Sequence, residues 1–330
     1  MTDLFDWIEA PNGHGGAGWR LKGDGLAPCV GWQVANCSMP APPIPLHVAS
    51  EQWARPMHAA RCAHAARPRI FVILTATVQP FVNLHRRGMG NQQRNPSERR
   101  ALYAEVVRRW ATESNVTIVF AENSGADLAP FEAQVPQWRR GAIEFFSVER
   151  QSREAYVRSA PPGAKYDVGR LEAQAIVDAL NRSALLAQRC PNDLVFKVTG
   201  RYFIHEFERT VRDRCLRRGN AHGADGASGP PLILHQQPDW GKQRGPGELE
   251  TMCMGFAARF ALAVLGWAVT PPARTLAVFR ETQVFSERRL AEVVNRMART
   301  PSLSGRVCPL GPLPVMPVRE GSSGVLRSSI

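Results

Sequence analysis

Apolar residues recur along the chain in two distinct patterns. Four short runs are mostly apolar and rich in β-branched or aromatic side chains, which is typical of buried strands. They span residues 70–76, 116–121, 143–147 and 194–198. Two longer segments, 96–113 and 167–188, carry their apolar residues at helical spacing, and the first opens on Asn95 and Ser97, either of which can cap a helix. The order strand, helix, strand, strand, helix, strand predicts an α/β fold with a mostly parallel sheet flanked by helices.

Downstream the pattern is less regular but continues to about residue 320. It predicts a helix over 205–218, a flexible loop over 219–230, strands at 232–235 and 251–254, helices over 256–267 and 285–299, and then Pro-rich extended segments. Residues 1–68 are rich in Gly, Pro, Ala and His without a sustained period, which predicts a largely disordered or loosely docked N-terminal segment. The chain is therefore expected to hold one α/β domain over 69–320, followed by a frayed tail over 321–330.

The formal net charge of +12 admits two interpretations. Only four of the 41 basic residues are lysine, and the arginines are spread along the whole chain. With the abundant Ala, Gly and Pro, this favours a compositional bias of the coding sequence. The alternative is selection for anionic ligands such as phosphates, nucleotides or nucleic acid.

Cysteine usage and hydropathy bear on the compartment. The seven cysteines include no Cys-x-x-Cys pair, and the eight histidines show no metal-ligand spacing, so we predict mostly reduced, buried cysteines and no metal site. A disulfide between distant cysteines stays open.

The first 30 residues do not resemble a signal peptide, and the most apolar stretch, 260–269, is too short to span a bilayer. We expect a soluble chain with no transmembrane segment, in the cytoplasm or in an endomembrane lumen.

Polar residues gather where three of the predicted strands end. In parallel sheets ligands bind at the carboxyl ends of strands, so these positions are the candidate binding site. The candidates are Thr75, Thr77, Asn123, Ser124, Lys197, Thr199, Gly200 and Arg201.

Each candidate has a functional and a structural interpretation. Lys197 and Arg201 can neutralise a diphosphate, or they can form a surface ion-pair cluster after a strand. The segment 122–125 can hydrogen-bond a ribose or base, with Glu122 accepting from a hydroxyl, or it can be a simple turn.

Acidic residues are the candidates for catalysis. Glu172, near the start of a helix, is a candidate general base, although a carboxylate there also complements the helix dipole. Glu248 and Glu250, before the predicted 251–254 strand, are similar candidates, and His235 is a weaker one.

Several common site motifs are missing from the sequence. It contains no GxxxxGK[ST] phosphate loop, no GxGxxG after the first strand and no GxSxG nucleophile elbow. It also contains no Asp-x-Asp pair, through which many nucleotide-sugar enzymes hold a divalent metal. We therefore predict no bound cofactor, while a divalent metal held without Asp-x-Asp stays open.

An ordered set of short motifs resembles a known family. The motifs are Ile-Leu-Thr-Ala-Thr-Val at 73–78, Phe-Ala-Glu-Asn-Ser-Gly at 120–125, Gly-Arg-Leu-Glu-Ala at 169–173, Phe-Lys-Val-Thr-Gly-Arg-Tyr at 196–202, Met-Gly-Phe at 254–256, Ser-Glu-Arg-Arg-Leu at 286–290 and Gly-Ser-Ser at 321–323. Together they resemble a glycosyltransferase-like family found in algae, large DNA viruses and bacterial polysaccharide gene clusters. Two places depart from the family pattern. Residues 166–172 hold one glycine where relatives carry Lys-Gly-x-Gly-Glu, and Met252 stands where relatives often carry an acid.

The resemblance implies a GT-A-like, Rossmann-like domain that moves a sugar from a nucleotide-sugar to a glycan, lipid or protein acceptor. On this hypothesis Thr75 and Asn123 contact the nucleoside. Lys197 and Arg201 hold the diphosphate, and Glu172 or Glu250 orients or deprotonates the acceptor. The alternatives are a basic nucleic-acid-binding protein, a catalytically inactive glycan-binding module, and another enzyme class on the same layout.

Overall fold

The computed structural model describes the strands, helices and connections that form most of the predicted domain. The described residues are 5–8, 18–21, 62, 67–79, 95–147, 168–216, 232–234, 253–258, 261, 307–310, 313–319 and 326–329.

The described part of the domain is built on a seven-stranded mixed sheet. In chain order its strands are β3 (Ile70–Ala76), β4 (Thr117–Glu122), β5 (Ile143–Ser147), β6 (Leu194–Thr199), β7 (Leu232–Leu234), β8 (Cys253–Ala257) and β9 (Val307–Pro309). Their order across the sheet is β5-β4-β3-β6-β8-β7-β9, and only β8 runs against its neighbours. The prediction of an α/β fold with a mostly parallel sheet is confirmed, and all four strands predicted between residues 70 and 198 are present.

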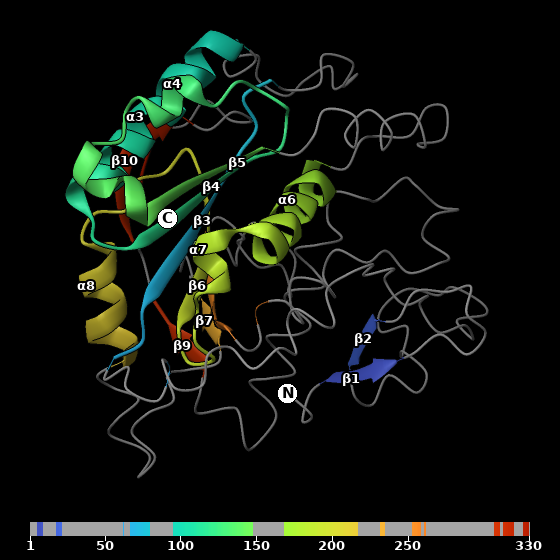
Figure 1. The fold of residues 1–330 in the computed structure, drawn as a ribbon. Coiled ribbons are helices and arrows are strands. Elements are labelled where there is room, and N and C mark those ends of the chain that lie inside the picture. Colours follow the sequence, from blue (N-terminus) through green and yellow to red (C-terminus); the bar gives the residue numbers. More distant parts are fainter. Residues whose placement is uncertain are drawn as a thin grey trace, which may run out of the picture.

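Helices cover both faces of this sheet (Figure 1). One face carries α3 (Pro96–Glu113), α4 (Ala129–Glu132) and α8 (Phe207–Val211), and the other carries α6 (Val168–Arg182) and α7 (Ala184–Ala187). The 3-10 helix η3 (Gln137–Ala142) precedes β5, and the π-helix η4 (Arg212–Leu216) follows α8. Every residue of β3 is buried, because helices pack on both of its faces, as its unbroken apolar run predicts.

Helix α3 begins where the sequence predicts. The Asn95 side chain accepts a hydrogen bond from the Ser97 backbone N–H over 2.9 Å, so Asn95 is the capping residue. The helix buries Trp110 against the core, and its indole N–H donates to the Tyr202 carbonyl over 2.9 Å. This bond joins α3 to the segment that follows β6.

The long helix predicted over 167–188 is two helices, and the reason is a contact from elsewhere in the chain. Ser183 interrupts it, and its hydroxyl accepts from the Leu186 N–H to cap α7. Glu144 of β5 accepts from the Ser183 hydroxyl at 2.6 Å and from the N–H groups of Ala184 and Leu185 at 3.1 and 3.0 Å. A carboxylate so placed satisfies N–H groups that a continuous helix would have bonded internally.

Other boundaries also differ from the sequence prediction. The strand predicted at 251–254 is β8 at Cys253–Ala257, so the helix predicted from residue 256 begins no earlier than Ala258. The helix predicted from 205 starts at Phe207, after Glu206 in a left-handed conformation (φ 50°). The predicted helix over 285–299 and loop over 219–230 lie outside the described residues.

Two short antiparallel pairs lie near the chain ends. Strands β1 (Phe5–Ile8) and β2 (Gly18–Leu21) pair within the predicted disordered or loosely docked segment. Strands β10 (Pro314–Arg319) and β11 (Leu326–Ser329) pair within the C-terminal region, so part of the predicted frayed tail is a strand.

Among the described cysteines, two disulfides replace the predicted reduced thiols. Cys62 bonds to Cys190 across 128 residues of sequence, and Cys215 bonds to Cys308 across 93. These pairs join segments that are distant in the chain, and the sequence offers no pattern that specifies them. Among the described cysteines, Cys253 carries a free thiol.

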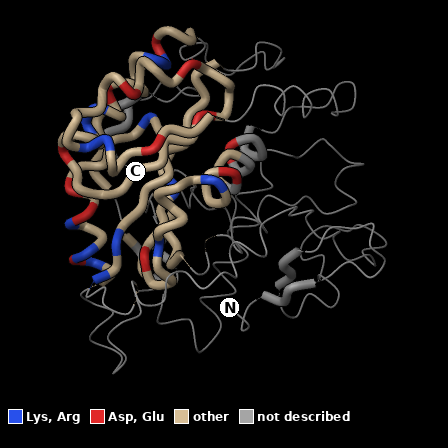
Figure 2. The backbone as a smooth tube through the Cα atoms, in the orientation of Figure 1, with Lys and Arg blue, Asp and Glu red and all other residues tan. Residues whose placement is uncertain are grey.

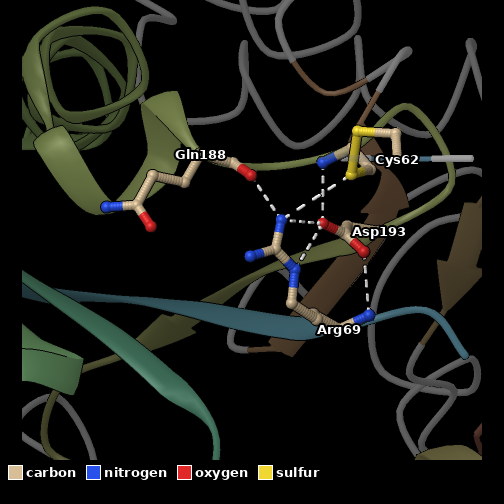
Figure 3. The surroundings of a disulfide bond; sticks show 5 residues. Cys62, Arg69, Gln188 and Asp193 are labelled. Carbon is tan, nitrogen blue, oxygen red and sulfur yellow. Dashed lines mark hydrogen bonds and ion pairs between the residues drawn. A yellow bond between two sulfur atoms is a disulfide. The ribbon is translucent and has the colours of Figure 1, made fainter. Parts of the chain in front are cut away.

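The first disulfide lies beside an ion pair at the start of β6 (Figure 3). Asp193, almost fully buried, accepts from the Arg69 backbone N–H at 2.8 Å and from its guanidinium at 2.8 and 3.0 Å. It also accepts from the Cys190 N–H at 2.7 Å. The amino ends of β3 and β6 are thus fixed together by the carboxylate, and Cys62 is linked to the same turn.

The free thiol of Cys253 is expected to be chemically silent in the folded protein. Burial raises its pKa to about 12, although the nearby charge of Lys197 acts in the opposite direction. At pH 8, iodoacetamide should therefore alkylate Cys253 in denatured but not in native protein, as read by peptide mass spectrometry. Equal rates in both states would contradict this assignment. The raised pKa favours folding below the unfolded pKa near 9, and that contribution is lost as the pH rises toward 12.

No helix in the described part of the chain is long and apolar enough to cross a membrane.

Candidate functional site

The sheet topology has a switch point between the carboxyl ends of β3 and β6. Open α/β sheets bind ligands in a crevice at such a point, and we call this edge of the sheet the crevice. From β3 the chain proceeds through β4 to β5, and it then returns through α6 and α7 to place β6 on the other side of β3. Helix α3 lies on one face and α6 on the opposite face. The strand order therefore reverses between β3 and β6, and ligands of open α/β sheets bind at such a point.

Four of the predicted site residues meet at this point on the α6 face. Side chains alternate along a strand, so Thr75 of β3 and both Lys197 and Thr199 of β6 point toward α6, where Glu172 meets them. Glu172 Oε1 accepts from the Thr75 hydroxyl at 2.5 Å and lies 3.0 Å from Lys197 Nζ. Lys197 Nζ also donates to Thr199 Oγ1 over 3.0 Å. The structure thus joins Thr75, Glu172, Lys197 and Thr199 in one network.

The two charged members of this network differ in exposure. The Lys197 side chain is 4% exposed and that of Glu172 is 27% exposed. A buried ammonium requires an opposite charge and hydrogen-bond acceptors close by, and Glu172 and Thr199 supply them. Because the Glu172 carboxylate borders solvent while its Oε1 is held, this group is placed to meet an incoming hydroxyl.

Gly200 lets β3 and β6 approach closely just beyond the network. Its N–H donates to the Thr75 carbonyl over 2.7 Å. A Cβ at Gly200 would lie 2.7 Å from that same oxygen, which is backbone and has no room to move. The glycine is therefore a steric requirement of the site.

We expect Gly200→Ala to separate the ends of β3 and β6. The added methyl group should lower the unfolding free energy by about 1–3 kcal/mol and weaken any ligand bound at the crevice. Denaturant unfolding measures the first effect. Gly141→Ala is the matched control, because its Cβ would meet no atom within 4 Å. Equal stability of the two variants would contradict the steric requirement.

Arg201 follows Gly200 and carries the second predicted cation. Its guanidinium carbon lies 5.3 Å from the centroid of the Tyr202 ring. Burial alone would lower the pKa of Arg201, but the combined pull of nearby groups raises it above the ordinary value. Those groups are Tyr202, Tyr103 and Glu172. Arg201 is thus a fixed positive charge beside the crevice.

Arg99 and Tyr103 are two site neighbours that the sequence reasoning missed. They lie one turn apart on α3 and reach the end of β3 from the opposite face. Arg99 Nε donates to the Thr77 carbonyl over 2.6 Å, and its Nη2 donates to the Tyr103 hydroxyl over 3.1 Å. The Tyr103 hydroxyl also accepts from the Thr77 N–H at 3.3 Å. The sequence signal that could have found them is their i, i+4 spacing near the start of a helix, which places both side chains on one helix face.

The remaining described candidates form a second cluster in the loops that follow β3 and β4. Thr77 Oγ1 donates to Asn123 Oδ1 over 2.7 Å, and Ser124 Oγ accepts from the Gln79 N–H over 2.9 Å. Asn123 and Ser124 are 3% and 2% exposed. Their hydroxyl and carboxamide oxygens therefore hold neighbouring loops together.

Three acidic or histidine candidates lie outside the described residues: Glu250, Glu248 and His235. Within the described ranges, no three His, Cys, Asp or Glu side chains come together as a metal-holding group.

Four arginines on or beside the described helices are matched by acids. Figure 2 shows Lys and Arg interspersed with Asp and Glu over the described part of the backbone. Ion pairs on the helices join Arg108 to Glu105, Arg109 to Glu113, Arg209 to Glu206 and Asp213, and Arg212 to Glu208. These pairs compensate the charge of those four arginines locally.

Comparison with known proteins gives similarity in structure at low identity. No protein-family model and no curated sequence matches the chain. The galactosyltransferase LgtC, solved with donor and acceptor sugar analogues, is similar with a TM-score of 0.38 and 9% identity over 72% of each chain. An active-site mutant of LgtC is similar with a TM-score of 0.39 and 10% identity, over 72% of this chain and 71% of the mutant's chain. A protein from Desulfovibrio desulfuricans G20, described as a nucleotide-diphospho-sugar transferase, has a TM-score of 0.36 and 14% identity. The similarity covers 74% of this chain and 80% of that protein's chain. Similarity at this level does not decide the function, which we infer from the site residues.

Proposed function

We propose that the protein is a glycosyltransferase that uses a nucleotide-sugar donor. The observation that carries the proposal is the convergence of Thr75, Glu172, Lys197 and Thr199 at the carboxyl ends of β3 and β6. Arg201 lies two residues after Thr199. A strand edge that combines a solvent-bordering carboxylate with fixed cations suits transfer from a diphosphate leaving group.

Each group in the site has a specific part in the proposed reaction. Arg201, with Lys197 behind it, stabilises the negative charge that develops on the leaving diphosphate. Glu172 accepts the proton of the acceptor hydroxyl. Glu250, which lies outside the described residues, is the alternative for this role. The Asn123 amide NH₂ donates to a carbonyl or hydroxyl oxygen of the nucleoside.

The same site supports donor binding in which side chains supply the positive charge. The sequence has no Asp-x-Asp pair, and the strand end that would carry such acids holds Lys197 and Arg201. We propose that these cations neutralise the diphosphate, so that a divalent metal contributes little to donor binding.

A thermal-shift screen tests the proposed function. UDP-, GDP-, CMP- and TDP-sugars are each added with Mn²⁺ or with EDTA, and the acceptor is left out. We expect one nucleotide class to raise the melting temperature in EDTA nearly as much as in Mn²⁺. No shift with any donor, together with salt-sensitive binding to RNA or DNA, would favour the nucleic-acid alternative. Binding of glycans without donor turnover would favour an inactive module.

The disulfides support one of the two compartments that the sequence leaves open. Cys62–Cys190 and Cys215–Cys308 would be reduced in the cytosol, whereas they persist in an oxidising compartment. We propose that the protein works in such a compartment, of which an endomembrane lumen is one.

A further inference from the structure

Glu122, the last residue of β4, is a fully buried carboxylate with an unusually complete set of donors. Its Oε1 accepts from the Val78 N–H at 3.0 Å and from the Ser124 hydroxyl. Its Oε2 accepts from the N–H groups of Ser124 and Ala126, each at 2.9 Å. A carboxylate offers about four acceptor positions, so these four donors occupy all of them.

This arrangement excludes direct contact between Glu122 and a ligand. The sequence hypothesis that Glu122 accepts from a ligand hydroxyl would require an exposed lone pair, and the side chain is 0% exposed. Any influence of Glu122 on the site must therefore pass through the groups that it holds.

The groups held by Glu122 belong to two different loops. Val78 lies in the loop after β3, whereas Ser124 and Ala126 lie in the loop after β4. Two further bonds join the same loops, from the Thr77 hydroxyl to Asn123 and from the Gln79 N–H to Ser124. The loops after β3 and β4 are thus held as one unit around a single buried charge. Charge-assisted bonds of this kind are among the strong ones in proteins.

These loops adjoin the crevice on the side away from the cations of β6. The network of Lys197 and Thr199 lies on β6, and β3 separates that strand from β4. On the proposed function, the cations take the diphosphate, which leaves the loops after β3 and β4 for the nucleoside. We infer that Glu122 is a positioning residue that sets these loops to receive the nucleoside of the donor. This inference rests on the proposed function.

Substitution of Glu122 by glutamine tests the inference, with Glu144→Gln as the matched control. Glu144 also accepts three bonds from one hydroxyl and two backbone N–H groups, but all three donors lie at the start of α7. Each amide replacement places an NH₂ group against an N–H donor, so both variants should melt below the wild type. Wild type and variants are titrated with the panel of UDP-, GDP-, CMP- and TDP-sugars by isothermal calorimetry.

We expect Glu122→Gln to raise the Kd of the bound nucleotide-sugar about tenfold and Glu144→Gln to leave it unchanged. Amide hydrogen exchange at residues 78, 79, 124 and 126 should accelerate in Glu122→Gln alone. If Glu122→Gln does not fold, Ser124→Ala removes the hydroxyl that bridges Gln79 and Glu122 and should shift Kd in the same direction.

The outcomes separate the two proposals. If Glu122→Gln binds the donor with the wild-type Kd, the positioning role is overturned and the proposed function stands. The same holds for Ser124→Ala where that variant has to be used. Equal weakening by both glutamine variants would also overturn it, because the effect would then follow from stability alone. Failure of the wild type to bind any donor would overturn the proposed function and this inference together.

Discussion

Replacing Arg201 with alanine is expected to reduce sugar transfer by about 10²–10³-fold, the loss that follows removal of one preorganised group that stabilises transition-state charge. Arg201 is fixed by its contact with the Tyr202 ring, and its surroundings keep it charged. The reduction should fall mainly on kcat, because charge on the leaving diphosphate grows as the glycosidic bond breaks. Release of nucleoside diphosphate over time measures the rate.

Arg108→Ala is the matched control for this experiment. Arg108 lies on the surface of α3 and pairs with Glu105 at 2.7 Å, away from the crevice. Its removal should leave the transfer rate unchanged, because an exposed ion pair of this kind contributes little to stability. An Arg201→Ala variant that transfers sugar at the wild-type rate would remove Arg201 from the mechanism.

The second large effect is expected from the disulfide between Cys62 and Cys190. The Cys62→Ser/Cys190→Ser variant should lose about 4–5 kcal/mol of unfolding free energy, because the bond closes a loop of 128 residues in the unfolded chain. Denaturant unfolding of oxidised wild type and of the double variant measures the difference. The turn that holds Asp193 and begins β6 should lose order first, since Cys190 lies in it.

Peptide mapping without reductant provides the control for this prediction. The oxidised protein should yield one peptide pair linked through Cys62 and Cys190 and another linked through Cys215 and Cys308. A reducing agent should destabilise the double variant less than the wild type, because the bond between Cys62 and Cys190 is already absent. Alkylation of all four residues as free thiols in untreated protein would contradict the pairing and the proposed oxidising compartment.

The sequence predicts the central sheet well because its strands are buried on both faces. A run such as 70–76 has no polar face, and the helices at 96–113 and 168–182 supply the cover that such a run needs. The strand-end rule then places Thr75 and Thr199 at the same edge, and the register pairs them directly.

Features set by distant contacts are beyond such reasoning. The apolar spacing continues from Leu180 through Ala184, yet the helix breaks at Ser183 because Glu144, 39 residues earlier, satisfies the N–H groups of a new helix start. The pairing of Glu172 with Lys197 likewise depends on how α6 packs on β6. Cysteine pairing is a third example, since seven cysteines are compatible with many connectivities.

The central claim is that cationic side chains at the end of β6 hold the diphosphate of a nucleotide-sugar. Its most direct test is isothermal titration of wild type and Arg201→Ala with the nucleotide-sugar selected by the thermal-shift screen, in buffer containing EDTA. We predict that the wild type binds in EDTA with an affinity close to that in Mn²⁺, and that Arg201→Ala binds at least about tenfold more weakly in both buffers. Binding that requires Mn²⁺ and is indifferent to the loss of Arg201 would contradict the claim.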